Sequence, residues 1–172
     1  FNVFIHRRVA RGKAMDDKKA SLERAAHEVF SENGYKDASV SEITRRAGMA
    51  VGSFYNYYQS KEEIFLETYV EENEKVRGQL IGEIDWEGKP IDVVDELFDR
   101  TLPAVLNNRI LAEWNNPAVS RMLHEHYSSE SGMADYPFHQ FLLDTFRKRL
   151  GQEGYEADLT NRILRVYDLI YY

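Results

Sequence analysis

The chain has 172 residues, of which 43% are hydrophobic and 30% charged, a composition typical of a globular protein with a sizeable core. It has no cysteine, which excludes disulfides, thiolate metal sites and a cysteine nucleophile. No run approaches the roughly 18 apolar residues that cross a membrane, and no secretory pattern opens the chain. We therefore expect a cytoplasmic protein without a membrane partner.

The net charge of −7 is spread unevenly along the chain. Residues 1–62 hold 11 Lys and Arg against 8 Asp and Glu, whereas residues 63–172 hold 11 against 21. A basic front on an acidic body is typical of a protein whose N-terminal part meets a polyanion. An uneven solvated surface explains the charges equally well, so charge alone leaves both interpretations open.

The first predicted helix is amphipathic, because apolar residues recur at the spacing of one helix face. These residues are Leu22, Ala25, Ala26, Val29 and Phe30. Asp16 or Asp17 is a suitable cap for its start, and Gly34 ends it. Residues 1–16 are predicted to be an N-terminal extension, either disordered or foreign to the natural protein, whose own start would then be Met15.

Three further helices follow closely. Ser39 is the expected N-cap of the second, with Glu42 at the capping-box spacing, and Gly48 stops it. A short third helix is predicted from about residue 50 to 57. Ser60 is the expected N-cap of a long fourth helix, which has a strongly charged C-terminal half.

The remainder is also helical in prediction. Residues 82–90 form a linker, and helices are expected at about 91–108, 116–130, 136–150 and 158–172. The fold class is therefore all-α, with residues 17–62 as an N-terminal domain and residues 63–172 as a connecting helix and helical body. The last segment ends within an apolar helical stripe, so we expect the chain to be truncated there.

The stretch AGMAVGSFYNYYQSK at residues 47–61 predicts a helix-turn-helix, in which the second helix enters the DNA major groove. Small residues from Ala50 to Ser53 would let that helix approach DNA closely. Phe54 and Tyr58 share a face and should pack inward. Tyr55 points elsewhere, so its phenol can reach a phosphate, and Lys61 is placed to contact the backbone as well.

The segment SVSEITRRAGMAVGSFYNYYQSKEEIF, with LERAAHEVFSENGYKDAS before it, resembles the DNA-binding signature of TetR-family transcriptional regulators. The resemblance implies an N-terminal three-helix DNA-binding domain, joined by a long helix to a helical ligand-binding and dimerisation domain. Met49, Ala50 and Thr44 depart from the usual pattern; Thr44 would add a hydroxyl contact. The implied DNA-binding residues are Ser39, Ser41, Thr44, Val51, Gly52, Ser53, Tyr55, Tyr57 and Lys61.

The resemblance further implies a homodimeric repressor that a small-molecule effector releases from a palindromic operator in double-stranded DNA. Effector identity is not readable from the residues. Rings and polar groups of the C-terminal domain are candidates for its pocket, although each ring taken alone is more often part of an ordinary core. The candidates are Phe98, Glu113, Trp114, Met122, Tyr127, Phe141 and Tyr167.

Other classes of function have less support. His124 and His126 lie two residues apart, so they face different sides of a helix, and we expect no metal and no cofactor. No glycine-rich phosphate loop, nucleophile elbow or zinc-ligand spacing occurs, so we expect no enzyme. The remaining alternative is a helical protein-interaction module whose helix-turn-helix does not bind DNA.

Overall fold

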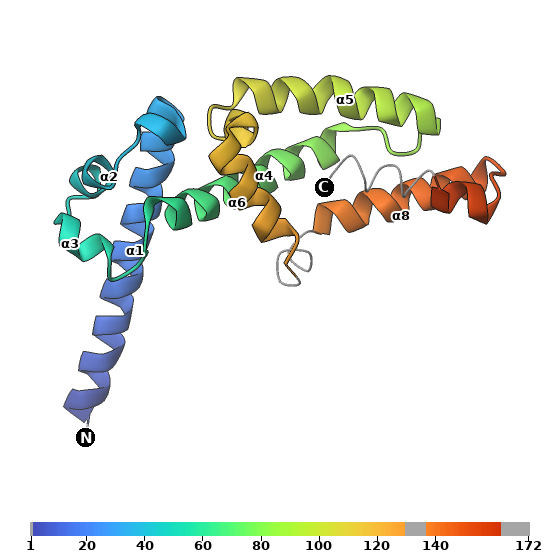
Figure 1. Cartoon of the computed structure of the whole chain (residues 1–172). Helices are drawn as coiled ribbons and strands as arrows, with labels where there is room; N and C mark the ends of the chain where they lie inside the picture. Colours follow the sequence, from blue (N-terminus) through green and yellow to red (C-terminus); the bar gives the residue numbers. More distant parts are fainter. Residues whose placement is uncertain (1, 130–136, 163–172) are drawn as a thin grey trace. The chain divides into compact units, whose positions relative to one another are not determined.

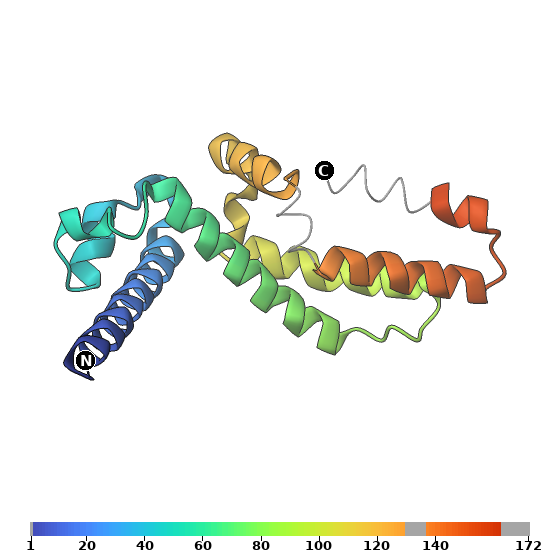
Figure 2. The same ribbon diagram turned by 90° about the horizontal axis from the view of Figure 1, so that it is seen from below.

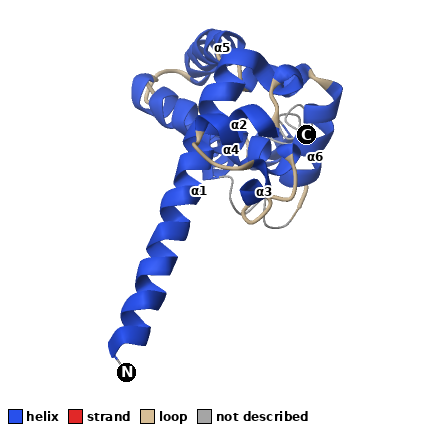
Figure 3. Cartoon of the chain, turned by 90° about the vertical axis from the view of Figure 1, so that its left-hand side faces the viewer, coloured by secondary structure: helices blue, strands red, loops and turns tan. Residues whose placement is uncertain are grey.

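The computed structural model describes residues 2–129 and 137–162, and every regular element among them is a helix, as predicted (Figures 1 and 3). In chain order the elements are α1 (Asn2–Asp37), α2 (Val40–Arg46), α3 (Val51–Phe54), α4 (Lys61–Glu83), α5 (Pro90–Asn107), the 3-10 helix η1 (Leu111–Asn115), α6 (Pro117–Tyr127) and α8 (Pro137–Gln152). Residues 157–162 are also helical. None of the described helices is both long and apolar enough to cross a membrane.

The chain divides into two compact units. The first comprises the chain up to Asn73 together with Asn108–Glu113, and the second comprises Glu74–Asn107 and the chain from Trp114 onward. The sequence predicted a boundary at residue 63, whereas residues 63–73 of α4 and the short segment 108–113 lie in the first unit. Segment 108–113 had no sequence signal that would separate it from its neighbours.

The core of the first unit is built on the predicted apolar face of α1. Leu22, Ala26, Val29 and Phe30 have no exposed surface and Ala25 is 3% exposed, which confirms the stripe. The ring of Phe30 meets that of Phe65 of α4 edge to face, with centroids 4.8 Å apart. Aromatic pairs favour this geometry because the positive ring edge faces the negative ring face.

The predicted break at Gly34 is present, because this residue has φ 73° and ψ −178° inside α1. Only glycine adopts this backbone conformation without strain. At its other end α1 is longer than predicted. Residues 2–16 continue the helix and run past α2 and α3 (Figures 1 and 3). Extending an existing helix avoids the cost of nucleation, and no proline interrupts this segment.

The second unit is centred on three buried residues, which are Leu80 of α4, Ile84 directly after α4 and Val93 of α5. Trp86 and Phe146 pack against this cluster. The turn between α4 and α5, visible in Figure 2, is fastened to α8 by Arg149, whose guanidinium donates to the carbonyls of Glu87 and Gly88. The predicted linker at 82–90 is thus an ordered turn within a helical body.

Candidate nucleic-acid interface

The helix-turn-helix consists of α2, the turn at Gly48 and α3. Ser39 caps α2, its hydroxyl accepting a hydrogen bond from the Glu42 amide at 3.2 Å, as the sequence predicts. Gly48 has φ 69°, and the next amide, of Met49, donates to the carbonyl of Thr44 at 2.8 Å. The positive φ turns the chain sharply, so α3 begins only a few residues after α2 ends.

Helix α3 is shorter than predicted, and the ring-rich residues after it form turns. It ends at Phe54, whose carbonyl accepts from the amides of both Tyr57, at 2.9 Å, and Tyr58, at 3.1 Å. Glycine, serine and aromatic residues have weak helix propensity, so the packing of Phe54 rather than propensity determines where α3 ends.

The rings divide into buried and exposed ones, as predicted. Phe54 is fully buried and Tyr58 is 2% exposed, and their centroids lie 5.7 Å apart. The Tyr58 hydroxyl donates to Oε1 of Glu23 on α1 at 3.1 Å. Burial, with the carboxylates of Glu67 and Glu23 nearby, raises the pKa of Tyr58, so its hydroxyl stays protonated and remains a donor. These two rings hold α3 and its following turn against the unit.

Most residues predicted to contact DNA are accessible on these short elements. Ser39, Ser41, Val51, Gly52 and Tyr55 are exposed, and Ser53 and Tyr57 are partly exposed. Tyr55 is 59% exposed, and among the described residues its hydroxyl has no hydrogen-bond partner. A Cβ added to Gly52 would meet no atom within 4 Å. The geometry leaves these groups available to a ligand; contact with DNA stays a prediction.

Thr44 requires a correction. It is completely buried, and its hydroxyl donates to the carbonyls of Val40 at 2.9 Å and Ser41 at 3.1 Å within α2. Serine and threonine in helices commonly bond back to the preceding turn. A side chain without exposed surface cannot reach a phosphate, so Thr44 is removed from the proposed DNA contacts.

Lys61 is engaged within the unit. Its ammonium donates to the carbonyls of Tyr35 at 2.8 Å and Ala38 at 3.1 Å, and it lies 4.3 Å from the centroid of the Tyr35 ring. The lysine therefore fixes the turn between α1 and α2 to the start of α4. Its predicted phosphate contact stays a prediction, and it would have to share this ammonium with the two carbonyls.

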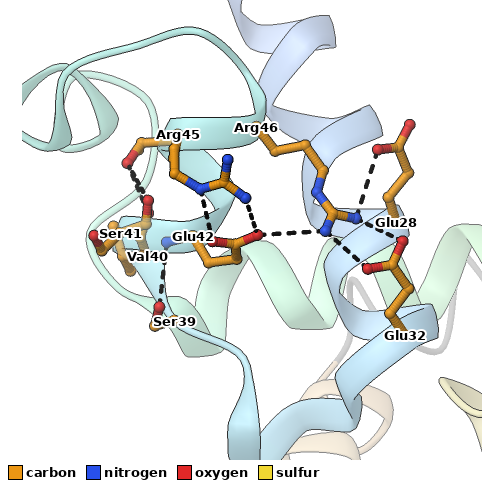
Figure 4. Close-up of polar contacts among 9 residues, drawn as sticks. Glu28, Glu32, Ser39, Val40, Ser41, Glu42, Arg45 and Arg46 are labelled. Atoms are coloured by element: carbon orange, nitrogen blue, oxygen red, sulfur yellow. Dashed lines mark hydrogen bonds and ion pairs between the residues drawn. The ribbon is translucent and has the colours of Figure 1, made fainter.

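The two arginines of α2 also have partners inside the unit (Figure 4). Arg46 donates two hydrogen bonds of 2.8 Å to Glu32 of α1 and lies 3.8 Å from Glu28 and 3.3 Å from Glu42. Arg45 donates two bonds to Glu42. Hydrogen bonds from Arg46 lower the pKa of Glu32, and those from Arg45 lower the pKa of Glu42. The Arg46–Glu32 pair spans 14 residues of sequence, for which no sequence pattern exists.

The residues predicted for an effector pocket fall in both units of the chain. Phe98 and Trp114 are 65% and 50% exposed. Glu113 belongs to the first unit, where its carboxylate accepts from the Tyr35 amide. Met122, Tyr127 and Phe141 are partly buried in the second unit, and Tyr167 lies outside the described residues. A pocket made of these residues stays a prediction.

Comparison with known proteins agrees with this geometry. Residues 23–68 match the family model of bacterial regulatory proteins of the tetR family. An HTH-type transcriptional regulator of Bacillus subtilis, YdgC, is 45% identical over 67 residues, which cover 39% of this chain and 34% of the relative. The fatty acid metabolism regulator protein of the same species is 45% identical over 47 residues, 27% of this chain and 24% of the relative. The chain thus matches about a third or less of each of these two relatives.

Two solved structures share the fold across both units. The transcriptional regulator FadR from Bacillus subtilis, in complex with stearoyl-CoA, has a TM-score of 0.51 at 20% identity, over 84% of this chain and 80% of that one. A TetR-family regulator from Mesorhizobium loti has a TM-score of 0.52 at 19% identity, over 80% and 69%. The segment that holds the helix-turn-helix therefore matches the tetR family of bacterial regulatory proteins in sequence, and the chain as a whole shares the fold of these two solved structures.

Proposed function

We propose that this chain is a sequence-specific DNA-binding regulator, and that it acts as a homodimeric repressor released from a palindromic operator by a small-molecule effector. The observation that carries the proposal is the division of the side chains of the helix-turn-helix into buried and exposed ones. Phe54 and Tyr58 are buried, whereas Val51, Gly52 and Tyr55 are exposed on and beside α3. A recognition helix needs this arrangement, with its packing residues inward and its reading residues outward.

Each exposed group has a role that its chemistry allows. The hydroxyls of Ser39, Ser41 and Tyr55 can donate to phosphates and fix the register of the protein on the duplex. Val51 and Ser53 would read base edges, by apolar contact and by hydrogen bonding. Gly52 would let the backbone of α3 approach the groove. Tyr57, partly exposed, would add a further backbone contact.

The dimer follows from the geometry of DNA. A four-residue recognition helix reads only a few base pairs, so one copy gives little specificity. Two copies related by a two-fold axis read a palindrome, provided that their recognition helices lie about 34 Å apart, one turn of the duplex. An effector that favours another spacing would cost one half-site and release the repressor.

The effector class is a separate part of the proposal. One solved structure that shares the fold holds stearoyl-CoA, and one relative with a similar DNA-binding segment is a fatty acid metabolism regulator. Stearoyl-CoA is therefore the first compound to add to a protein–DNA complex. Loss of the complex would support an acyl-CoA effector, and an unaffected complex would redirect the search to other small molecules.

The experiment that tests the proposal is selection of DNA sites from a random pool, at two salt concentrations. Recovery of a palindrome with half-sites about one turn apart would support a dimeric operator-binding protein. Failure to enrich any sequence with the folded protein would favour the protein-interaction module instead. A complex that persists unchanged at high salt would also count against DNA binding, because phosphate contacts release counterions.

A further inference from the structure

A short segment from the C-terminal part of the chain belongs to the first unit. Asn108–Glu113 follows α5 and includes the first three residues of η1, and it belongs to the unit that contains the helix-turn-helix. Ile110 and Leu111 anchor it, since each is only 1% exposed. The Asn108 side chain shapes the turn, its Oδ1 accepting from the amides of Ile110 at 3.1 Å and Leu111 at 3.2 Å. The residues on either side, Asn107 and Trp114, already belong to the second unit.

One end of this segment is tied to α1 and α4 through a buried carboxylate. Nδ2 of Asn108 donates to Oε1 of Glu72 at 2.7 Å, and Oε2 of Glu72 lies 2.8 Å from Nε2 of His27. Glu72 is only 7% exposed. A carboxylate at this depth needs hydrogen-bond donors to offset its lost hydration, so the Asn108 amide is a structural partner of α4.

The other end meets the turn that leads into the helix-turn-helix. Oε1 of Glu113 accepts from the amide of Tyr35 at 2.8 Å. The preceding residue, Gly34, leaves room for this contact, because a Cβ there would lie 2.5 Å from the same oxygen. On its other side Tyr35 is held by α4: its hydroxyl donates to Glu62 at 2.7 Å and its carbonyl accepts from Lys61.

We infer that Glu113 is a positioning residue for the helix-turn-helix: by holding the Tyr35 amide it sets the turn from which α2 and α3 follow. Tyr35 lies four residues before Ser39, the cap of α2. Because Glu113 is joined covalently to Trp114, a displacement of that part of the body pulls the carboxylate away from the turn. The regulatory role of this contact rests on the proposed function, because it requires that the protein bind DNA.

This assignment competes with the sequence-based one, in which Glu113 and Trp114 contact an effector. The positioning role and the effector-binding role require different properties of the Glu113 carboxylate. A contact to the Tyr35 amide needs an acceptor oxygen at the right reach, and charge is secondary. An ion pair with a cationic ligand needs the charge. Glu113→Gln keeps the reach and removes the charge, whereas Glu113→Asp keeps the charge and withdraws the oxygen by one methylene.

The test measures amide hydrogen exchange by NMR in the full chain, together with affinity for a selected DNA site. Glu113→Ala is expected to speed exchange of the Tyr35 amide by about tenfold or more, since the amide loses its hydrogen-bond acceptor. The Ile43 amide, which donates to Ser39 at the start of α2, is expected to exchange faster as well. The Ser120 amide at the start of α6 is the internal control.

Two conservative variants of Glu113 distinguish a positioning role from a general loss of stability. Glu113→Gln is expected to restore slow exchange and DNA affinity, and Glu113→Asp is expected to behave like the alanine variant. Glu125→Ala removes an exposed carboxylate from α6 and serves as the matched control for charge. Normal behaviour of the aspartate variant with loss in the glutamine variant would overturn the inference in favour of a charged ligand contact.

Two further outcomes are informative. Unchanged DNA affinity in Glu113→Ala, with the Tyr35 amide exchanging freely, would show that the contact does not position the reading helix and would overturn the inference. If the unaltered protein bound no DNA, the proposed function would fail. The exchange rates at Tyr35 and Ile43 would even then support or overturn the positioning role, because they are measured without DNA.

Discussion

Replacing Tyr55 by phenylalanine removes one hydroxyl and leaves the ring in place. The ring packs edge to face on Phe54 with centroids 5.3 Å apart, and the variant retains that contact. The hydroxyl has no partner among the described residues, so its loss should not change the free energy of unfolding. If it donates to a phosphate, the lost bond to a charged acceptor corresponds to about 1.5–3 kcal/mol, or roughly a 10- to 150-fold weaker complex.

Tyr58 provides the matched control in the same short segment. Its hydroxyl is buried and donates to the carboxylate of Glu23, so Tyr58→Phe should lower stability by about 1.5–3 kcal/mol. For a unit of this size each kcal/mol lowers the melting temperature by about 4–8 °C. Below the melting transition, the same variant should bind DNA almost normally, because the ring still supports α3.

The assays are thermal unfolding followed by circular dichroism and fluorescence anisotropy with a selected DNA site. The expected pattern is a loss of affinity without loss of stability for Tyr55→Phe, and the reverse for Tyr58→Phe. Equal affinity of Tyr55→Phe and the unaltered protein would refute the phosphate contact. A lowered melting temperature in that variant would refute the claim that its hydroxyl is without a structural role.

Three other changes have defined outcomes. Gly52→Leu should fold normally, since an added Cβ meets no atom within 4 Å, but it should abolish DNA binding by blocking close approach; tight binding in an anisotropy assay would contradict the docking of α3. Arg46→Ala should lower the melting temperature, more at low salt than at high salt, because it frees Glu32 from its ion pair. A hydrogen bond from Tyr35 lowers the pKa of Glu62, so this contribution to stability is present above the ordinary pKa of 4.5 and is lost as pH falls through the lower folded value. In Tyr35→Phe, acid unfolding should therefore depend less steeply on pH below 4.5.

Local signals in the sequence located most of the helix-turn-helix. Ser39 is the cap of α2, and Gly34 and Gly48 adopt the positive φ values that only glycine adopts easily. The inward faces of Phe54 and Tyr58 were also predictable, because residues four apart share a helix face. Each of these features depends on residues close together in the chain, where spacing determines which groups meet.

The prediction for Thr44 was wrong, and partners that lie far apart in the chain were not predictable from local spacing. Thr44 has a hydroxyl in a DNA-binding motif, but the buried face of α2 directs that hydroxyl to its own helix. The partners of Arg46 and Glu113 lie 14 and 78 residues away. Such pairings depend on how the helices pack. A charged residue on a helix face indicates that its side chain meets either a partner or solvent, but its position in the sequence does not identify the partner.

These pairings change how attraction to DNA must be explained. The N-terminal charge balance of +3 suggested a simple electrostatic surface, yet the positive groups of Arg45, Arg46 and Lys61 all have acceptors within the unit. A cation that already contacts a carboxylate or carbonyl must give up that contact to bind a phosphate. Its net contribution to the free energy of DNA binding is therefore smaller than that of an unpaired cation. We therefore expect DNA affinity to depend more on neutral donors such as Ser39 and Tyr55, which are exposed. We predict that the ion pairs of α2 stabilise the helix-turn-helix, and that the exposed hydroxyls of Ser39 and Tyr55 contribute more to DNA affinity than Arg45 and Arg46 do.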